Sequence, residues 1–279
     1  MKDQWLNTME KLIKEDDEDF IKRKDQCLPK YLIKYRNVNQ HSLESLKNDT
    51  IWFDKPANFN DPYDCSITVT GKPFNDYLEG LIKNIEEQHG KFNDTNRQYF
   101  ADFATKGVID ELNEYVQNSC LVCCFTTKFD SMLMWSHYAD CHSGFCMIYD
   151  ISGISPSSYI RKNLYPVIYS EKKFDISYYV DKSLEADYPF IASLCWKNKV
   201  WSYENEYRIV LPYGKEKSIP QSLPFIKPTY ICLGSKMSKE NDDIITDIAL
   251  DRGIKILKMH CEPQNYKLGA RELLWKRRE

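Results

Sequence analysis

Two glutamates and an arginine lie at alternate positions in one segment of the sequence, as Glu204, Glu206 and Arg208. The surrounding pattern predicts a strand at 203–212, and residues two apart on a strand share one face. Two neighbouring carboxylates repel each other when both are ionised, a cost tolerated where they perform acid–base work or face a cation. Arg208 would neutralise one of the two carboxylates. The alternative is a solvent-facing row of charged side chains, with the apolar residues of the strand turned inward.

Polar residues also stand at the ends of two other predicted strands. The strand at 31–36 ends in Arg36, where a guanidinium group can hold a phosphate through two parallel hydrogen bonds. The strand at 120–127 ends in Thr126 and Thr127, which offer two hydroxyl groups. An arginine, a hydroxyl pair and an E-x-E motif in this order resemble the R…S/T…E-x-E pattern of the ADP-ribosyltransferases.

This resemblance implies an enzyme that binds NAD as a substrate and holds it with side chains. Arg36 would contact the phosphates or the nicotinamide-side ribose, and Thr126 with Thr127 would brace the active-site strand. Glu206 would accept a hydrogen bond from the ribose 2′-hydroxyl and stabilise an oxocarbenium-like transition state. Glu204 would orient or deprotonate the acceptor. The hydroxyl motif is Phe-Thr-Thr where the family has Ser-Thr-Ser, and about 170 residues between Arg36 and Glu206 imply large helical insertions.

A short predicted helix at 131–140 carries three further candidate ligand-binding residues. Trp135 and Tyr138 are three residues apart and share a helix face, so either ring could stack on nicotinamide. His137 could act as a general base or as a cation that binds phosphate. The alternative for this aromatic segment is ordinary packing between two strands.

Longer sequence boxes resemble the bacterial family called domain of unknown function 2971. These boxes run from about residue 31 to residue 211 and read YLIKYR, IWFDKPANFNDPYD, CFTTKFDSMLMWSHYAD and W-x-x-E-x-EYRIV. The resemblance marks a family and implies no particular activity. Within the second box, FNDPYD is typical of a turn, with Asn60 or Asp61 bonded to the backbone.

Two other function classes compete with the transferase. A metal-dependent nuclease could hold Mg²⁺ with Asp61 or Asp64 together with Glu204 and Glu206, because hard cations prefer clustered carboxylates. Such nucleases use a lysine after the glutamates, and position 208 is an arginine. The other class is a non-catalytic module that binds a ligand or a partner through its aromatic boxes.

The composition limits how a phosphorylated ligand can be bound. The chain has 10 glycines in 279 residues, about half the usual frequency, and none fall in a G-x-G pair. This excludes the G-x-G-x-x-G fingerprint and the P-loop, so side chains would have to hold a phosphate. A net charge of −3 gives no overall attraction to nucleic acid or to an anionic membrane.

The setting expected from the sequence is the cytoplasm. No secretory signal or membrane span is apparent, so the ten cysteines are expected to be reduced, and they lack the spacing of a metal site. NAD is the expected small-molecule partner, and the acceptor is a protein, a nucleic acid or water. By association, a bacterial toxin or a phage-defence effector would suit such an enzyme.

Helical and strand patterns alternate irregularly along the chain. Residues 1–26 predict an N-terminal helical extension, and 27–279 a single α+β domain. Helices are expected at 41–49, over most of 74–118, at 176–195 and after Ser238; further strands are expected at 51–56, 144–151 and 166–170 and on both sides of the last helix. The fold class is α+β, with a mixed, largely antiparallel sheet, helical insertions and the arrangement of an ADP-ribosyltransferase.

Overall fold

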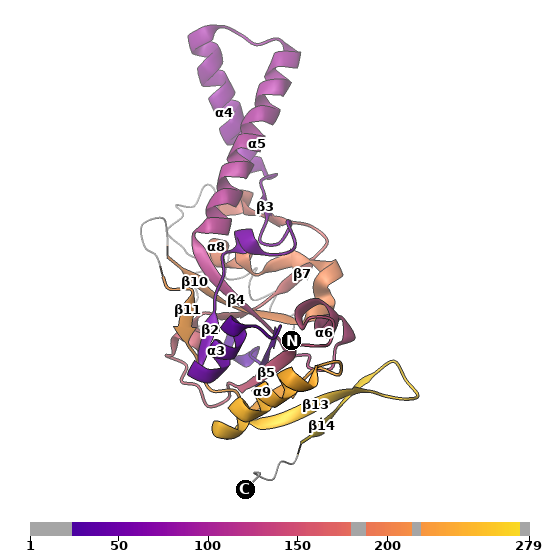
Figure 1. The fold of residues 1–279 in the computed structure, drawn as a ribbon. Helices are drawn as coiled ribbons and strands as arrows, with labels where there is room; N and C mark the ends of the chain where they lie inside the picture. Colours follow the sequence, from indigo (N-terminus) through magenta and orange to yellow (C-terminus); the bar gives the residue numbers. More distant parts are fainter. Residues whose placement is uncertain (1–23, 180–187, 214–218, 274–279) are drawn as a thin grey trace.

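An eight-stranded sheet forms the centre of the protein (Figure 1). The computed structural model describes residues 24–179, 188–213 and 219–273. The strand order is β14-β13-β12-β5-β1-β4-β10-β6, and all neighbours run antiparallel except β12 and β13. In chain order the strands are β1 (Tyr31–Arg36), β4 (Cys120–Thr126), β5 (Phe145–Asp150), β6 (Leu164–Pro166), β10 (Glu206–Pro212), β12 (Tyr230–Leu233), β13 (Lys255–Cys261) and β14 (Leu268–Glu272). The α+β class with a mixed, largely antiparallel sheet is therefore confirmed.

Short strand pairs and helices surround this sheet. The small pairs are β2 (Thr50–Trp52) with β11 (Ser222–Pro224), β3 (Ile67–Thr68) with β8 (Phe174–Asp175), and β7 (Ile168–Ser170) with β9 (Trp196–Asn198). The helices are α3 (Gln40–Asn48), α4 (Lys72–His89), α5 (Asp94–Asn118), α6 (Met132–Tyr138), α7 (Tyr159–Lys162), α8 (Tyr188–Leu194) and α9 (Lys239–Asp251), with 3₁₀ turns η1 (Pro56–Asn58), η2 (Ile176–Tyr179) and η3 (Lys199–Glu204).

Both faces of the sheet are covered, because apolar residues alternate between two cores. On one face, side chains of β4 and β10 such as Phe125 and Ile209 pack with residues of α3 and α9. On the other face, Val122 and Val210 pack with α5 and α8, while Ile33 and Tyr35 of β1 pack with α6. Successive side chains of a strand point to opposite faces. We call the second face the site face, because it also carries Tyr35, Cys124, Thr126, Glu206 and Arg208.

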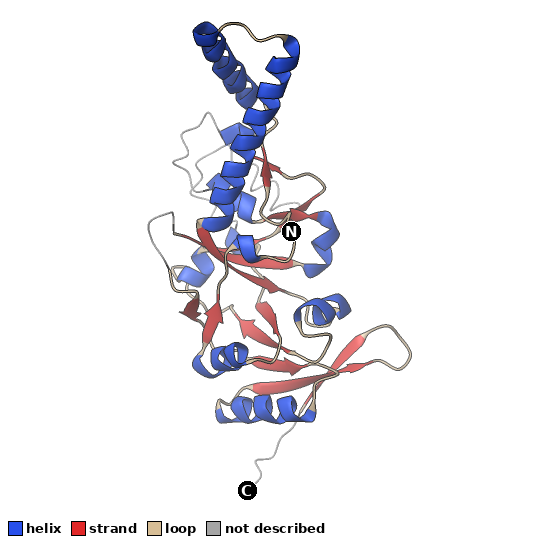
Figure 2. Cartoon of the chain, turned by 45° about the horizontal axis from the view of Figure 1, so that its top comes forward, coloured by secondary structure: helices blue, strands red, loops and turns tan. Residues whose placement is uncertain are grey.

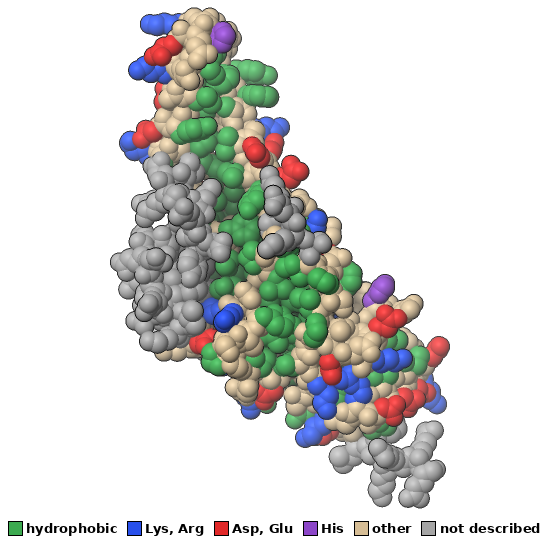
Figure 3. Space-filling model, turned by 90° about the vertical axis from the view of Figure 1, so that its left-hand side faces the viewer, with side chains coloured by type: hydrophobic (Ala, Val, Ile, Leu, Met, Phe, Trp, Pro, Cys, Tyr) green, Lys and Arg blue, Asp and Glu red, His purple; other side chains and the backbone are tan. Residues whose placement is uncertain are grey.

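Helices α4 and α5 form a hairpin that projects from the body of the protein (Figures 1 and 2). Four aromatic side chains of this hairpin are exposed: Tyr77, Tyr99, Phe103 and Tyr115. In Figure 3, hydrophobic side chains gather along the hairpin and continue onto the body below it. The hairpin is inserted between β3 and β4 and spans 72–118, under a third of the sequence that separates Arg36 from Glu206. It is the longest of the helical segments between these two residues in the described parts of the chain.

Several predicted elements differ from the observed ones. The expected strand at 203–212 begins only at Glu206, and Glu204 lies in η3. Asn205 between them has a left-handed backbone, with φ of 46°, which ends the 3₁₀ turn before the strand begins. The expected strand at 166–170 is divided between β6 and β7, and β14 was not predicted. All but the last three residues of the expected 1–26 helix lie outside the described residues.

Other expectations are confirmed in detail. Ser238 caps α9 by accepting a hydrogen bond from the backbone N–H of Asn241, and Gly253 follows the helix with φ of +63°. Asp61 caps the FNDPYD turn by accepting a hydrogen bond from the Tyr63 N–H at 2.9 Å. No helix in the described parts of the chain is long and apolar enough to cross a membrane.

Candidate functional site

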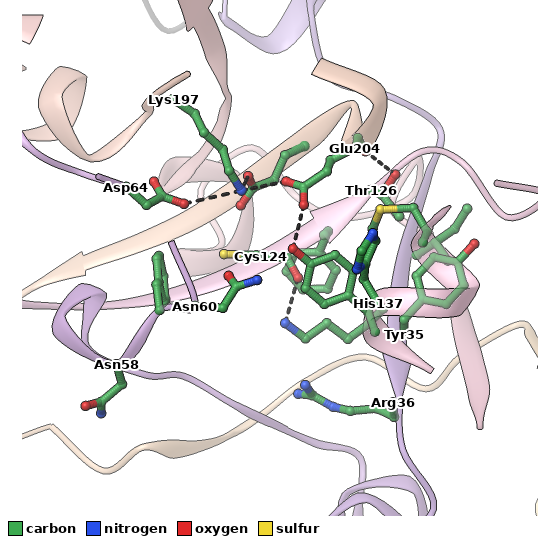
Figure 4. Close-up of a pocket in the computed structure, with 17 residues that line it drawn as sticks. Tyr35, Arg36, Asn58, Asn60, Asp64, Cys124, Thr126, His137, Lys197 and Glu204 are labelled. Atoms are coloured by element: carbon green, nitrogen blue, oxygen red, sulfur yellow. Dashed lines mark hydrogen bonds and ion pairs between the residues drawn. The ribbon is translucent and has the colours of Figure 1, made fainter. Parts of the chain in front are cut away.

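A cavity of about 390 Å³ opens between β1 and β4 and is lined from both faces of the sheet, by Thr126 and Glu206 on the site face and by Arg36 on the other (Figure 4). Its walls come from β1, β4, β9, β10, α6, η3, η1 and the loop after η1. The polar and charged residues that line it are Lys34, Tyr35, Arg36, Asn58, Asn60, Asp64, Cys124, Thr126, His137, Tyr138, Lys197, Glu204 and Glu206. The cavity therefore gathers polar residues from segments that are far apart in the sequence.

The cavity exists because β1 and β4 separate from each other. The two strands are paired at a single position, Ile33 with Thr126, whereas β1 pairs with β5 along its whole length. Beyond that position the carbonyl of Cys124 is not paired with the backbone of β1; it accepts a hydrogen bond from the side-chain ammonium group of Lys34 at 2.7 Å. A side chain thus satisfies a backbone group that regular pairing would have used. The residues of β1 and β4 on either side of this gap do not pair with each other, and they line the cavity.

The buried end of the cavity holds three carboxylates around one ammonium group. Lys197 Nζ donates to Glu204 Oε2 at 2.5 Å and to Glu206 Oε2 at 3.0 Å, and it lies 3.3 Å from Asp64 Oδ2. The side chains of all four residues are at most 5% exposed. An ammonium group can donate three hydrogen bonds, and here it makes two of them to the glutamates and an ion pair with Asp64. Lys197 is the centre to which these carboxylates converge.

Arg208 completes this group of charges from the interior side. Its Nε donates to Glu206 Oε1 at 2.8 Å, and its Nη2 contacts both Asp64 oxygens at 2.9 and 2.8 Å. It is fully buried, and a further bond reaches the carbonyl of Leu194 at 2.6 Å. We call Asp64, Lys197, Glu204, Glu206 and Arg208 the charged cluster. Three carboxylates against two cations leave one negative charge when every acid is ionised.

The two glutamates are electrically different. Burial acts to raise the pKa of both. For Glu206 the adjacent Arg208 and Lys197 outweigh burial and hold the pKa far below its usual range. For Glu204 burial prevails, aided by repulsion from Glu206, and its pKa is raised despite the contact with Lys197. Glu206 therefore stays ionised, whereas Glu204 is the member of the pair that can exchange a proton.

Helix α6 places Tyr138 against Glu204 and His137 at the wall of the cavity. The hydroxyl of Tyr138 donates to Glu204 Oε1 at 2.5 Å, and burial together with the nearby carboxylate raises the pKa of Tyr138 well above its usual value. His137 is exposed at the cavity wall, and its ring lies 6.4 Å from the ring of Tyr203. The main chain of Glu204 is fixed as well, because its carbonyl accepts a hydrogen bond from the Thr126 hydroxyl at 2.5 Å.

Arg36 lies at the more open side of the cavity, across from Lys197 in Figure 4. Its side chain is half-buried and makes no hydrogen bond or ion pair with another residue in the ranges that the structure describes. It stands three residues beyond the Ile33–Thr126 pair, roughly 10 Å along the strand at 3.3 Å per residue. The cavity thus has carboxylates at its buried end and, at its open end, a guanidinium that no described residue neutralises.

Six of the eight candidate site residues line this cavity. They are Arg36, Thr126, His137, Tyr138, Glu204 and Glu206. Strands β1, β4 and β10, which carry the arginine, the threonine and the second glutamate, are neighbours in the sheet.

The other two candidates lie outside the cavity lining. Trp135 is completely buried, with its ring 5.0 Å from that of Tyr35 and its Nε1 bonded to the Phe129 carbonyl at 2.7 Å. The expectation that it stacks on nicotinamide is wrong, because no face of its ring is open. Thr127 accepts a hydrogen bond from the Asn205 side chain, so it braces the link between η3 and β10.

The burial of the charged cluster overturns one alternative and weighs against another. A solvent-facing row of charges is wrong, because Glu204, Glu206 and Arg208 are all at most 5% exposed. A Mg²⁺ site is disfavoured by charge, since Lys197 and Arg208 already occupy the positions between the carboxylates. Asp61 turns instead to the backbone of its own loop.

Lys197 is the residue that sequence reasoning missed altogether. It lies on the three-residue strand β9, in a segment where lysines recur at 197 and 199 with no pattern that separates a buried one from an exposed one. Asp64 was considered only as a metal ligand. Both residues become recognisable only when β9 and the FNDPYD loop meet β10.

Residues 134–209 match the model of the family described as "Protein of unknown function (DUF2971)". This match confirms the family resemblance seen in the sequence. It contains four members of the charged cluster, Lys197, Glu204, Glu206 and Arg208, while Arg36, Asp64 and Thr126 lie before it. No curated protein and no solved structure gives a significant match, so the likeness to ADP-ribosyltransferases rests on the residue pattern.

Proposed function

We propose that the cavity binds NAD and that the protein transfers ADP-ribose from NAD to a macromolecule, or hydrolyses NAD, as ADP-ribosyltransferases do. The observation that carries this proposal is that Arg36, Thr126 and Glu206, from three neighbouring strands, line one cavity. Sequence order alone gives no reason for these residues to meet. Their meeting is what a shared ligand would require.

The distribution of charge in the cavity supports NAD as the ligand. NAD has a cationic nicotinamide ring at one end and an anionic pyrophosphate in its middle. The charged cluster offers carboxylates at the buried end, and Arg36 offers at the open end a cation that has no partner among the described residues. Nicotinamide beside the carboxylates and pyrophosphate beside Arg36 would satisfy both ends.

The same orientation gives each residue a chemical role. Water or an acceptor hydroxyl attacks C1′ of the ribose, the bond from C1′ to the ring nitrogen breaks, and nicotinamide leaves with the bonding electrons. Glu206 remains ionised and supplies fixed negative charge for the oxocarbenium-like transition state. Glu204, whose pKa is raised, takes the proton of the attacking group. Tyr138 and His137 border the space for the leaving ring.

The test is release of nicotinamide from labelled NAD, with cell lysate as a source of acceptors. Arg36→Gln is the first variant, because Arg36 has no partner among the described residues and its loss leaves the fold intact. We expect kcat/KM for NAD to fall about 10- to 100-fold, the range for losing a charge-assisted bond to phosphate. Glu171→Gln is the matched control, since Glu171 is 77% exposed and lies outside the cavity; it should match the wild type.

Two glutamate variants separate chemistry from binding. Glu204→Gln and Glu206→Gln should lower kcat far more than they change the dissociation constant of NAD, with circular dichroism confirming that each is folded. No nicotinamide release by the wild type would count heavily against a transferase. NAD binding without release would favour the non-catalytic module, and Mg²⁺-dependent cleavage of nucleic acid, abolished by EDTA, would favour the nuclease.

The acceptor and the biological setting follow from the same proposal. The lysate assay identifies the acceptor as protein, nucleic acid or water by where the label is recovered. We expect the reaction to take place in the cytoplasm, where NAD is available and free cysteines persist. An enzyme that modifies macromolecules in this way would serve as a toxin or as a phage-defence effector.

A further inference from the structure

A second cavity begins where the first one ends, at Arg36. It has a volume of about 260 Å³, and its walls come from α3, the turn before it, and β2. Arg36 is the residue that lines both cavities, which makes it the junction between them. The other lining residues are Asn39, His41, Ser42, Ser45 and Trp52.

The size of the first cavity makes this neighbour relevant. A volume of about 390 Å³ lies near the lower end of the roughly 300–1,000 Å³ range of small-molecule sites. NAD consists of two nucleotides joined by a pyrophosphate, so a cavity of this size suits the nicotinamide half. The second half must then lie beyond Arg36.

The second cavity has an aromatic wall that is open to a ligand. Trp52 is 42% exposed, which is unusual for the largest apolar side chain. Its ring lies 6.5 Å from that of His41 at an angle of 37°, so the two rings are not stacked on each other. An exposed tryptophan face beside a histidine is a surface on which a planar heterocycle can stack.

The second cavity also has polar side chains that make no hydrogen bond with a described residue, although one of its serines is occupied. Ser42 is fully occupied in capping α3, with bonds to the backbone of Asn37 and Asn39. In contrast, the Ser45 hydroxyl and the His41 imidazole make no hydrogen bond with any residue that the structure describes. These two groups and Arg36 remain available for ribose and phosphate oxygens.

We propose that the second cavity binds the adenosine monophosphate half of NAD, with adenine stacked on Trp52 and the pyrophosphate on Arg36. This inference rests on the proposed function for the identity of the whole ligand. The subsite itself is defined by an aromatic base and an adjacent phosphate. It therefore predicts binding of a free nucleotide whether or not the protein cleaves NAD.

The test uses calorimetric titration with three probes: NAD, AMP and nicotinamide mononucleotide. Trp52→Ala should weaken NAD and AMP about 5- to 150-fold, the range for losing one base–aromatic stack, and should leave nicotinamide mononucleotide within twofold. Trp52→Phe, which keeps an aromatic face, should retain most of the affinity for NAD and AMP. Phe103→Ala is the matched control, because Phe103 is 68% exposed on the distant hairpin. Arg36→Gln should weaken all three probes, since it serves both cavities.

The outcomes separate this inference from the proposed function. If the wild type binds no AMP, or if Trp52→Ala leaves AMP and NAD unchanged, the second subsite is refuted even when nicotinamide is released. Equal weakening of nicotinamide mononucleotide by Trp52→Ala would refute it too, because the effect would not be local. If AMP binding depends on Trp52 while NAD is never cleaved, the subsite stands and the transferase falls.

Discussion

Replacing Lys197 with methionine tests whether the charged cluster is held together by that single ammonium group. Lys197 faces Asp64, Glu204 and Glu206 at 2.5–3.3 Å, with its side chain only 5% exposed. Methionine has a similar volume and no charge, so the substitution leaves three buried carboxylates with Arg208 as the remaining cation of the charged cluster. Breaking a buried ion pair from one side costs about 3–5 kcal/mol, because the remaining charge stays buried without compensation. We expect a loss of this size in the free energy of unfolding.

The chain supplies a matched control two residues away. Lys199 pairs with Glu171 at 3.0 Å, the same distance as Lys197 to Glu206, but both of its side chains lie in solvent. Exposed pairs contribute about 0–1 kcal/mol, since water screens them. Urea denaturation of Lys197→Met and Lys199→Met at pH 7 therefore compares the loss in unfolding free energy when a buried and an exposed ion pair of the same length are removed. Equal losses in the two variants would refute the reasoning.

A second substitution tests the charge count directly. Glu204→Gln in the Lys197→Met background removes one carboxylate and restores the cluster to one excess negative charge. The double variant should be more stable than Lys197→Met alone, although each substitution removes a contact. Purely additive losses in this double-mutant cycle would show that the carboxylates do not share the lysine.

Substitutions at three further positions test features outside the cavity lining. Burial lowers the pKa of Lys24 to about 8, so between pH 8 and 10.5 the unfolded chain binds a proton that the folded chain has released, and the stability of the fold rises with pH. The free energy of unfolding of the wild type, measured relative to that of Lys24→Met, should increase by about 2–3 kcal/mol over this range. A difference between the two proteins that does not change with pH would contradict the lowered pKa. Asn205→Ala should destabilise by about 1–2 kcal/mol because its φ is 46°, and Asn205→Gly should cost clearly less; equal losses would exclude backbone strain as the cause. Trp135→Ala should cost about 3–5 kcal/mol in denaturant, as for other fully buried aromatic residues, and a loss below 1 kcal/mol would contradict its structural role.

The parts of the site that could be predicted from sequence are those with a strong local pattern. YLIKYR and CLVCCFTT are strands by alternation or apolar run, so Arg36 and Thr126 could be placed at strand ends. Glu206 follows from the strand that begins with it. That these strands are neighbours, and that β1 separates from β4, depends on long-range pairing that a single sequence does not encode locally.

The residues that escaped prediction lack any such pattern. Lys197 sits on a three-residue strand, and its burial is decided by η3 and β10 folding over it. Glu204 was placed on a strand because an alternating pattern continues through it; the left-handed turn at Asn205 breaks that pattern without any glycine to mark it. Trp135 and Tyr138 looked equivalent on one helix face, and only packing against Tyr35 separates the buried ring from the one at the cavity.

The positions of the charged cluster in the sequence mean that the parts of the site are synthesised at different times. The bond between Asp64 and Arg208 spans 144 positions of the chain, and both cations of the cluster lie after residue 196. During synthesis, Asp64 and the arginine-bearing strand β1 leave the ribosome long before either cation exists. A chain cut short before Lys197 contains the FNDPYD turn, the α4–α5 hairpin and α6, yet none of the groups that neutralise its buried acid. The cavity is thus completed only by the last third of the polypeptide, and a partly made chain carries no assembled site.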